Sequence, residues 1–166
     1  MCLNLQFCYD KDGNPKYNYE LTHYLFNRMQ KRSSFMQRLN ASKKGEITCW
    51  KVYDTGNSLK LLQSLWQGQR INKAGVVKSD RASKEFTISE YAGGFVNRGI
   101  HVFTTRKKAE KELRWASPSG SNKRFVIVPV ICRKSDLIAQ GVADDAVFMK
   151  VRIEKRTWDK IFSEKK

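Results

Sequence analysis

The chain has 166 residues, of which 40% are hydrophobic and 29% are charged. These proportions exclude an intrinsically disordered chain, and the length suits one domain with a sizeable core. Lys and Arg number 32 against 16 Asp and Glu, and the resulting net charge of +16 exceeds what solubility requires and favours a polyanionic partner.

The cysteines and the apolar runs bear on the compartment. Cys2, Cys8, Cys49 and Cys132 form no C-x-x-C pair, and only two histidines accompany them. We therefore expect reduced thiols, no metal site and no cofactor. No apolar run approaches the roughly 20 residues that span a bilayer, and the first residues lack the features of a signal peptide. A cytoplasmic protein without a membrane partner is expected.

The first part of the chain predicts helices. No glycine or proline occurs from Tyr17 to Ala41, and apolar residues recur there at helical spacing. Ser33 and Ser34 are expected to divide this region into two helices, with Ser34 as a candidate N-cap of the second. Gly45 ends the region. We expect one domain over residues 1–166, with a helical front at about 17–44 and a β-rich body at about 46–162.

Strand patterns follow in chain order. EITCWKVYD (46–54) alternates and is rich in β-branched and aromatic residues. GVVKS (75–79) and EFTISEY (85–91) predict short strands, residues 58–66 fit either helix or strand, and Gly93-Gly94 indicates a turn. GIHVF (99–103) predicts a buried strand, with Thr104 or Thr105 capping a helix that begins near Arg106.

The last third of the chain predicts two longer strands and a helix. RFVIVPVICR (124–133) reads as a strand whose Pro129 indicates an edge position or a bulge. KSDLIAQG (134–141) reads as a short turn, and DAVFMKVRIE (145–154) as one alternating strand. A short helix with Trp158 and Phe162 closes the chain. The class is α+β, a mixed or antiparallel sheet with an N-terminal helical segment and helices packed on one side.

Two groups of cations have no neighbouring acid. Between Glu20 and Glu46 no acidic residue occurs, although like charges one helical turn apart repel. On the helix from Arg106, each cation of the pairs Arg106–Glu110 and Lys108–Glu112 can be neutralised by its acid. The second row on this helix, Lys107, Lys111 and Arg114, contains no acid. A solvated surface is the plain interpretation, and contact with phosphates is the functional one. The candidate phosphate-binding residues are Arg28, Lys31, Arg32, Arg38, Lys43, Lys44, Lys107, Lys111, Arg114, Lys123 and Arg124.

Aromatic side chains accompany basic ones where nucleic-acid bases are stacked. Trp66 lies among polar and basic residues and is a candidate exposed ring, and Tyr91 and Phe35 are weaker candidates. Trp50, Trp115 and Trp158 lie in patterned segments and are expected in the core. Since no RNP-type motif, GXXG loop or zinc finger occurs, recognition of backbone or shape is expected, with RNA or a ribonucleoprotein as the partner.

The stretch GIHVFTTRKKAEKEL (99–113) resembles the central strand–helix unit of ADP-ribosyltransferase-like domains. The resemblance implies that TCWKVY (48–53) occupies the place of the first NAD-contacting strand. There Lys51 stands where that family has Arg or His. It also implies NAD as a cofactor, with His101 and Glu154 as catalytic residues. This enzyme is the alternative to a nucleic-acid-binding protein.

A short, strongly basic single domain without an enzyme motif also resembles the small counter-defence proteins of phages. It is most similar to anti-CRISPR proteins that act on RNA-guided effectors. A net charge of +16 excludes mimicry of DNA, which requires negative charge. The resemblance therefore implies contact with the guide RNA, or with the RNA-binding channel, of an RNA-targeting effector in the bacterial cytoplasm.

Overall fold

A computed structural model of the chain describes residues 3–9, 15–16, 34–56, 60–64, 69–79, 95–96, 99–116, 125–141 and 144–163. Its helices are α2 (Ser34–Ala41), α3 (Arg106–Ala116) and α4 (Lys155–Ser163), and a 3-10 turn covers Lys134–Asp136. Its strands are β1 (Leu3–Tyr9), β2 (Pro15–Lys16), β3 (Glu46–Asp54), β4 (Leu62–Ser64), β5 (Arg70–Ile71), β6 (Gly75–Lys78), β7 (Phe95–Val96), β8 (Ile100–Phe103), β9 (Phe125–Arg133), β10 (Leu137–Gly141), β11 (Asp145–Phe148) and β12 (Lys150–Ile153).

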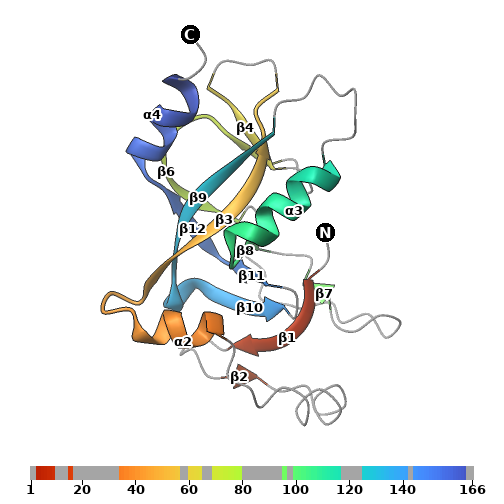
Figure 1. The fold of residues 1–166 in the computed structure, drawn as a ribbon. Coiled ribbons are helices and arrows are strands. Elements are labelled where there is room, and N and C mark those ends of the chain that lie inside the picture. The colour runs from red at the N-terminus through yellow and green to blue at the C-terminus, as the bar shows by residue number, and fades with distance from the viewer. Residues whose placement is uncertain are drawn as a thin grey trace.

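The strands of the described residues form one antiparallel sheet in the order β2-β1-β10-β11-β8-β3-β9-β12-β6. Its centre is the ladder between β3 and β9, which runs without interruption from Glu46↔Arg133 to Asp54↔Phe125. Figure 1 shows α2 and α4 near opposite ends of these two strands, with α3 lying across them. The expected α+β class is confirmed.

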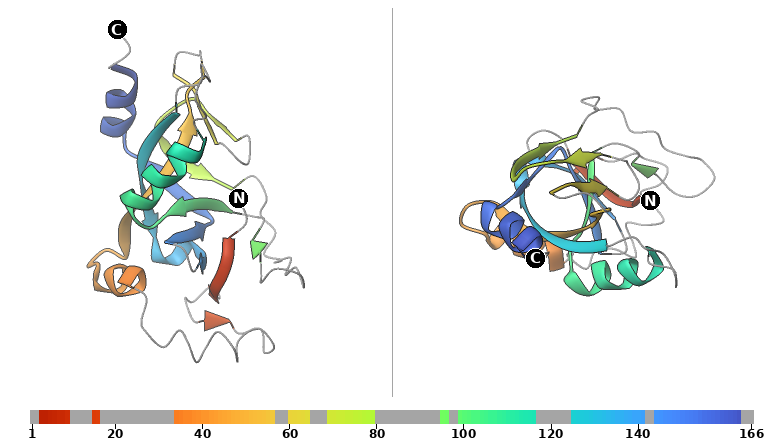
Figure 2. Two further views of the ribbon diagram at one scale, coloured as in Figure 1. Left: turned by 45° about the vertical axis from the view of Figure 1, so that its right-hand side comes forward. Right: turned by 90° about the horizontal axis from the view of Figure 1, so that it is seen from above.

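The sheet is strongly curled, as the view from above in Figure 2 shows. Next to β3, β4 pairs with β5, and the Gln69 side chain just before β5 donates a 2.7 Å hydrogen bond to the carbonyl of Lys78 in β6. This bond links the pair β4–β5, which branches from β3, to the edge strand β6. The interior is filled by one main core, which includes the buried side chains of Tyr53, Leu62, Val77, Val128, Ile153 and Trp158.

A second, smaller core lies under α3. The alternation of β3 turns Cys49 and Tyr53 toward the main core, and turns Val52 toward α3. There Val52 packs with Phe103 of β8 and with Ala109 of α3. Thr105 caps the helix, because its Oγ1 accepts a 3.3 Å hydrogen bond from the backbone nitrogen of Lys108. The expected strand, cap and helix at 99–116 are therefore confirmed.

Three strand predictions were wrong in part. Residues 137–141 form strand β10, where a turn was expected. The segment 145–154 is two strands, because the backbone of Met149 bonds to Asp136 and Ser79 and leaves the ladder. Pro129 causes no bulge, and β9 is an internal strand between β3 and β12. Beside Pro129, however, β12 has already ended, since it pairs with β9 at Ile131 and Cys132.

The helical front is described only in its second half. The helix expected from Ser34 is α2, and Gly45, with φ of +61°, follows it in a turn. Phe35, a weak candidate for an exposed ring, is instead 2% exposed, because it packs edge-on against Phe148 at 6.4 Å. Residues 17–33, the strand expected at 85–91 and the Gly93-Gly94 turn lie outside the described residues.

Candidate nucleic-acid interface

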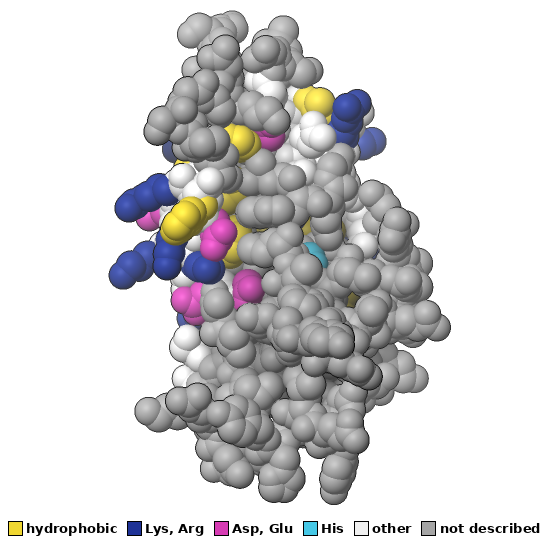
Figure 3. Space-filling view, turned by 90° about the vertical axis from the view of Figure 1, so that its right-hand side faces the viewer, with side chains coloured by type: hydrophobic (Ala, Val, Ile, Leu, Met, Phe, Trp, Pro, Cys, Tyr) yellow, Lys and Arg dark blue, Asp and Glu magenta, His cyan; other side chains and the backbone are white. Residues whose placement is uncertain are grey.

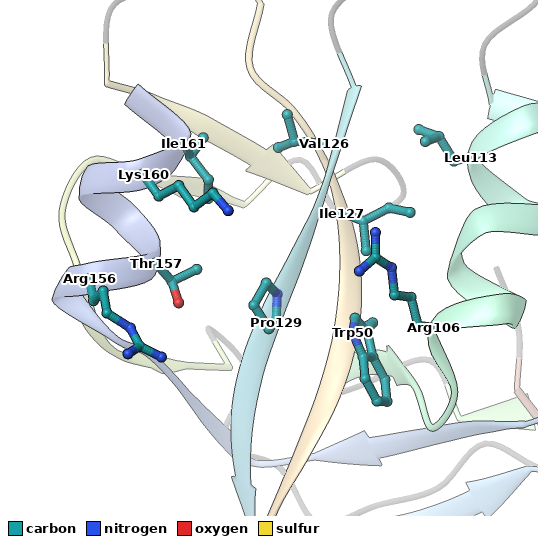
Figure 4. Close-up of a pocket in the computed structure, with 10 residues that line it drawn as sticks. All are labelled: Trp50, Arg106, Leu113, Val126, Ile127, Pro129, Arg156, Thr157, Lys160 and Ile161. Atoms are coloured by element: carbon teal, nitrogen blue, oxygen red, sulfur yellow. The ribbon is translucent and has the colours of Figure 1, made fainter. Parts of the chain in front are cut away.

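An open groove of about 830 Å³ lies between α3 and α4, over the outer surface of β9 and β3. Figure 4 shows the two helices as its walls and the two strands as its floor. The residues that line it are Trp50, Leu113, Val126, Ile127, Pro129, Thr157 and Ile161, together with the cations Arg106, Arg156 and Lys160.

The floor of the groove is apolar because of the strand alternation. In β9, Val128 and Val130 are buried in the main core, so Ile127 and Pro129 are turned to the outer surface. Trp50 is the direct cross-strand neighbour of Pro129 in β3 and is half-buried. The ring of Trp50 and the ring of Pro129 therefore lie side by side on the groove floor.

The wall formed by α4 is amphipathic. Trp158 is 6% exposed and stacks at a tilt on Phe162, with the ring centroids 4.8 Å apart. Arg156 and Lys160 are one helical turn apart on another side of the helix, and both line the groove (Figure 4). The packing of Trp158 into the core thus fixes which cations of α4 face the groove.

The charge of the groove differs from that of the nearby surface. Elsewhere, Arg133 and Arg152 both pair with Glu46, and the hydrogen bond from Arg133 is the main reason why the pKa of Glu46 is lowered. Arg106 at the groove edge pairs with Glu110 at 2.9 Å, as the sequence predicted. No carboxylate in the described part of the chain pairs with Arg156 or Lys160. Of the ten described lining residues, three are cations and none is an acid.

The cation row predicted on α3 lies outside this groove. Lys107 and Lys111 are each two residues from the buried Ala109, about 200° around the helix, so they point away from the sheet. Arg114 is also exposed, and Figure 3 shows Lys and Arg side chains projecting on this side of the molecule, with acids among them. The row is therefore an outward surface next to the groove.

The tryptophans are distributed differently from the expectation. Trp158 is in the core as predicted, but Trp50 is only half-buried and Trp115 is 77% exposed. Trp115 follows Leu113 by two residues, which turns it about 200° away from the side of α3 that packs on the sheet. The prediction that Trp115 belongs to the core was wrong. Trp66 and Tyr91 lie outside the described residues.

Other predicted phosphate-binding residues are separate from the groove or are not described. Arg38 donates a 3.0 Å hydrogen bond to the carbonyl of Thr104, which ties α2 to the end of β8. Lys43 and Lys44 are exposed in the turn after α2. The candidates that lie outside the described residues are Arg28, Lys31, Arg32, Lys123 and Arg124.

The residues of the enzyme alternative do not form one site. His101 lies on β8 and is 6% exposed, whereas Glu154 is exposed at the end of β12. In the sheet order, β3 and β9 stand between β8 and β12. The residue that the structure does bring to His101 is Lys51, whose Nζ donates a 3.0 Å hydrogen bond to the His101 carbonyl.

Lys51, which the sequence placed only where the resembled family has Arg or His, is a buried cation, and its burial was not predicted. It is 2% exposed, and its Nζ lies 5.6 Å from the centroid of the Tyr53 ring. Burial lowers the pKa of its amine to about 8. The signal was present in the alternation of 46–54, because Lys51 is in phase with Cys49 and Tyr53. The amine of Lys51 donates its hydrogen bond to the carbonyl of His101, two residues before Phe103. The pair Trp50↔Phe103 is the one residue pair that joins β3 to β8 in the described sheet.

No protein-family model matches this chain, and no curated protein or solved structure matches it significantly. Among the described residues, no group of His, Cys, Asp and Glu side chains is arranged to hold a metal ion, and no helix is long and apolar enough to cross a bilayer. In the described part of the chain, the groove between α3 and α4 combines three cations with an apolar floor.

Proposed function

We propose that the protein binds RNA, and that the phosphate backbone is held in the groove between α3 and α4. The observation that carries this proposal is the convergence of Arg106, Arg156 and Lys160 on a groove whose described lining contains no acid. Each of these cations can donate charge-assisted hydrogen bonds to phosphate oxygens.

The electrostatic argument favours an anionic occupant. Arg156 and Lys160, one helical turn apart, repel each other by a few tenths of a kcal/mol in water. A phosphate between the two walls replaces this repulsion by attraction to both helices. The net charge of +16 adds a long-range field that raises the rate of encounter with any polyanion.

The biological setting in this proposal comes from the resemblance to phage counter-defence proteins. In that setting the bound RNA is the guide RNA of an RNA-targeting effector, and the protein inhibits the effector by occupying the RNA or its channel. The positive charge supports contact with RNA and is unsuited to imitation of nucleic acid.

The test is a pair of charge reversals, Lys160→Glu in the groove and Lys111→Glu on the outward side of α3. Both lysines are exposed and helical, and both substitutions change the net charge equally. With a labelled RNA hairpin carrying a single-stranded tail, we expect Lys160→Glu to weaken binding by about tenfold or more, and Lys111→Glu by less than about threefold. Inhibition of a purified RNA-targeting effector should follow the same order.

Two results would contradict the proposal. If the wild-type protein does not bind the hairpin even at low salt, it is not an RNA-binding protein. If both reversals weaken binding equally, the charge acts as a general field and the groove is not the site. Melting temperatures close to that of the wild type are expected for both variants, because exposed charge substitutions seldom change stability by more than about 0.5 kcal/mol.

A further inference from the structure

The floor of the groove has a chemistry that phosphate binding does not require. Phosphates need only donors and positive charge, but the outward floor of the groove consists of the apolar side chains of Trp50, Pro129 and Ile127. Trp50 and Pro129 are direct cross-strand neighbours, so they form a continuous apolar surface between the two basic walls (Figure 4). The occupant is expected to present an apolar face to this surface and negative charge to both sides.

A nucleic-acid duplex does not present such a face. Its bases are stacked inside, and its surface consists of phosphates, sugars and base edges. An unpaired nucleotide does present one, because its base has two exposed faces that stack on aromatic side chains while its phosphates remain at the outside. The combination of an apolar floor and cationic walls thus distinguishes single strands from duplexes.

We infer that the groove binds single-stranded RNA, with an unpaired base packed on Trp50 and Pro129 and with the adjacent phosphates held by Arg156 and Lys160 on one side and Arg106 on the other. This inference rests on the proposed function and adds the form of RNA that is recognised. The groove volume of about 830 Å³ lies within the range of roughly 300–1,000 Å³ that small-ligand sites have, so a short segment of the strand occupies it.

This arrangement does not predict sequence-specific recognition of base edges. The walls of the groove carry guanidinium and ammonium donors, together with the hydroxyl of Thr157, and the floor is apolar. Every base has a face that can stack, so recognition is expected to tolerate many sequences. The competing occupant is an acidic peptide with an apolar side chain. Such a peptide lacks the regularly spaced charges of a nucleic-acid strand, which could continue onto the basic surface beyond the groove.

The experiment compares three probes of equal phosphate number, which are a short oligouridylate, the same oligomer without bases, and a duplex. The wild-type protein is expected to bind the oligouridylate at least about tenfold more tightly than the abasic oligomer, which is about 1.4 kcal/mol. It should also prefer the oligouridylate to the duplex. These comparisons need no variant, so they decide the inference whether or not a substituted protein folds.

Variants then locate the base-binding surface. Trp50→Leu should reduce the preference for the oligouridylate over the abasic oligomer to less than about threefold, whereas Trp50→Phe should keep most of it because a ring remains. The matched control is Trp115→Leu, since Trp115 is 77% exposed on α3 and does not line the groove. This control should retain the full preference.

The outcomes separate the inference from the proposed function. If none of the three probes binds, both fail. If the oligouridylate, the abasic oligomer and the duplex bind equally, the protein is an RNA-backbone binder and the inference alone is overturned. Displacement of the oligouridylate by a short peptide of Glu and Leu at equal concentration would assign the groove to an acidic peptide and would also overturn it.

Discussion

Lys51 combines two properties that are rarely found together, full burial and a single described acceptor for its amine. Its Nζ donates to the carbonyl of His101, and the ring of Tyr53 lies 5.6 Å away. No carboxylate of the described residues pairs with it. A buried ammonium without a counter-ion is unfavourable, which is the reason that the pKa of Lys51 falls to about 8.

This shift predicts how stability depends on pH. The pKa of Lys51 is about 8 in the folded protein and 10.5 for an ordinary lysine, so between these values the unfolded chain holds a proton that the folded protein has released. The fold therefore gains stability as the pH rises through this window. At pH 7 the buried, protonated amine lowers the free energy of unfolding by about 3 kcal/mol, and this cost disappears as the pH rises through the window.

Lys51→Met tests the prediction, because it removes the titrating amine. We compare the free energy of unfolding of Lys51→Met with that of the wild type. The difference, variant minus wild type, should fall by about 3 kcal/mol between about pH 7 and about pH 10.5, whether the variant is more or less stable than the wild type at pH 7. Urea unfolding at several pH values measures it, with Lys111→Met as the control for an exposed lysine. Identical pH profiles for the two variants would show that Lys51 titrates as an ordinary surface amine.

At the scale of elements, α3 depends on its cap. The first turn of this helix contains Arg106, Lys107 and Lys108 and no acid, and cations are unfavourable at the positive end of the helix dipole. The hydroxyl of Thr105 compensates by accepting the hydrogen bond from the nitrogen of Lys108 at 3.3 Å. Because α3 carries Arg106 and Leu113, the cap also holds one wall of the groove.

Thr105→Ala should therefore lower the free energy of unfolding by about 1 kcal/mol, and Thr105→Ser should restore most of the loss. Urea denaturation of the three proteins measures this difference. A serine variant as unstable as the alanine variant would mean that the methyl group of Thr105, and not its hydroxyl, stabilises the start of α3.

The sequence predicts β9 correctly because this strand has one buried face. In β9 the outward Pro129 and Arg133 alternate with buried Val128, Val130 and Cys132, and this period of two is visible in the residues themselves. In β11 all four residues are buried, so alternation carries no information about where the strand ends. The break at Met149 is decided by hydrogen bonds to Asp136 and Ser79, which no local pattern contains.

At the scale of the whole molecule, composition predicts a basic protein, but the fold decides which cations converge. Arg106 and Arg156 are separated in the chain by the four strands β9, β10, β11 and β12. They share a groove only because α3 and α4 pack on either side of β9. The sequence singled out the row Lys107, Lys111 and Arg114 because it lacks acids. The sequence did not predict that the groove cations bind phosphate, because Arg106 can pair with Glu110 and because α4 is short.

The distribution of charge predicts how binding depends on salt and on strand length. Each phosphate of a single strand that is neutralised contributes about 0.7 to the slope of log affinity against log salt. A short oligouridylate that fills only the groove meets Arg156 and Lys160 and also Arg106, which is already paired with Glu110, so a slope between about −1.4 and about −2 is expected. A longer strand can continue onto the outward side of α3, where Lys107, Lys111 and Arg114 are exposed, and should have a steeper slope.

The two charge reversals should act differently on these slopes. Lys160→Glu is expected to make the short-strand slope shallower by about 0.7 or more, and Lys111→Glu should leave it unchanged but flatten the long-strand slope. Fluorescence anisotropy between about 50 mM and about 200 mM salt measures both. Equal slopes for short and long strands would confine all neutralisation to the groove. A short-strand slope that Lys160→Glu leaves unchanged would instead mean that counterions are released elsewhere, and that α4 does not hold the phosphates.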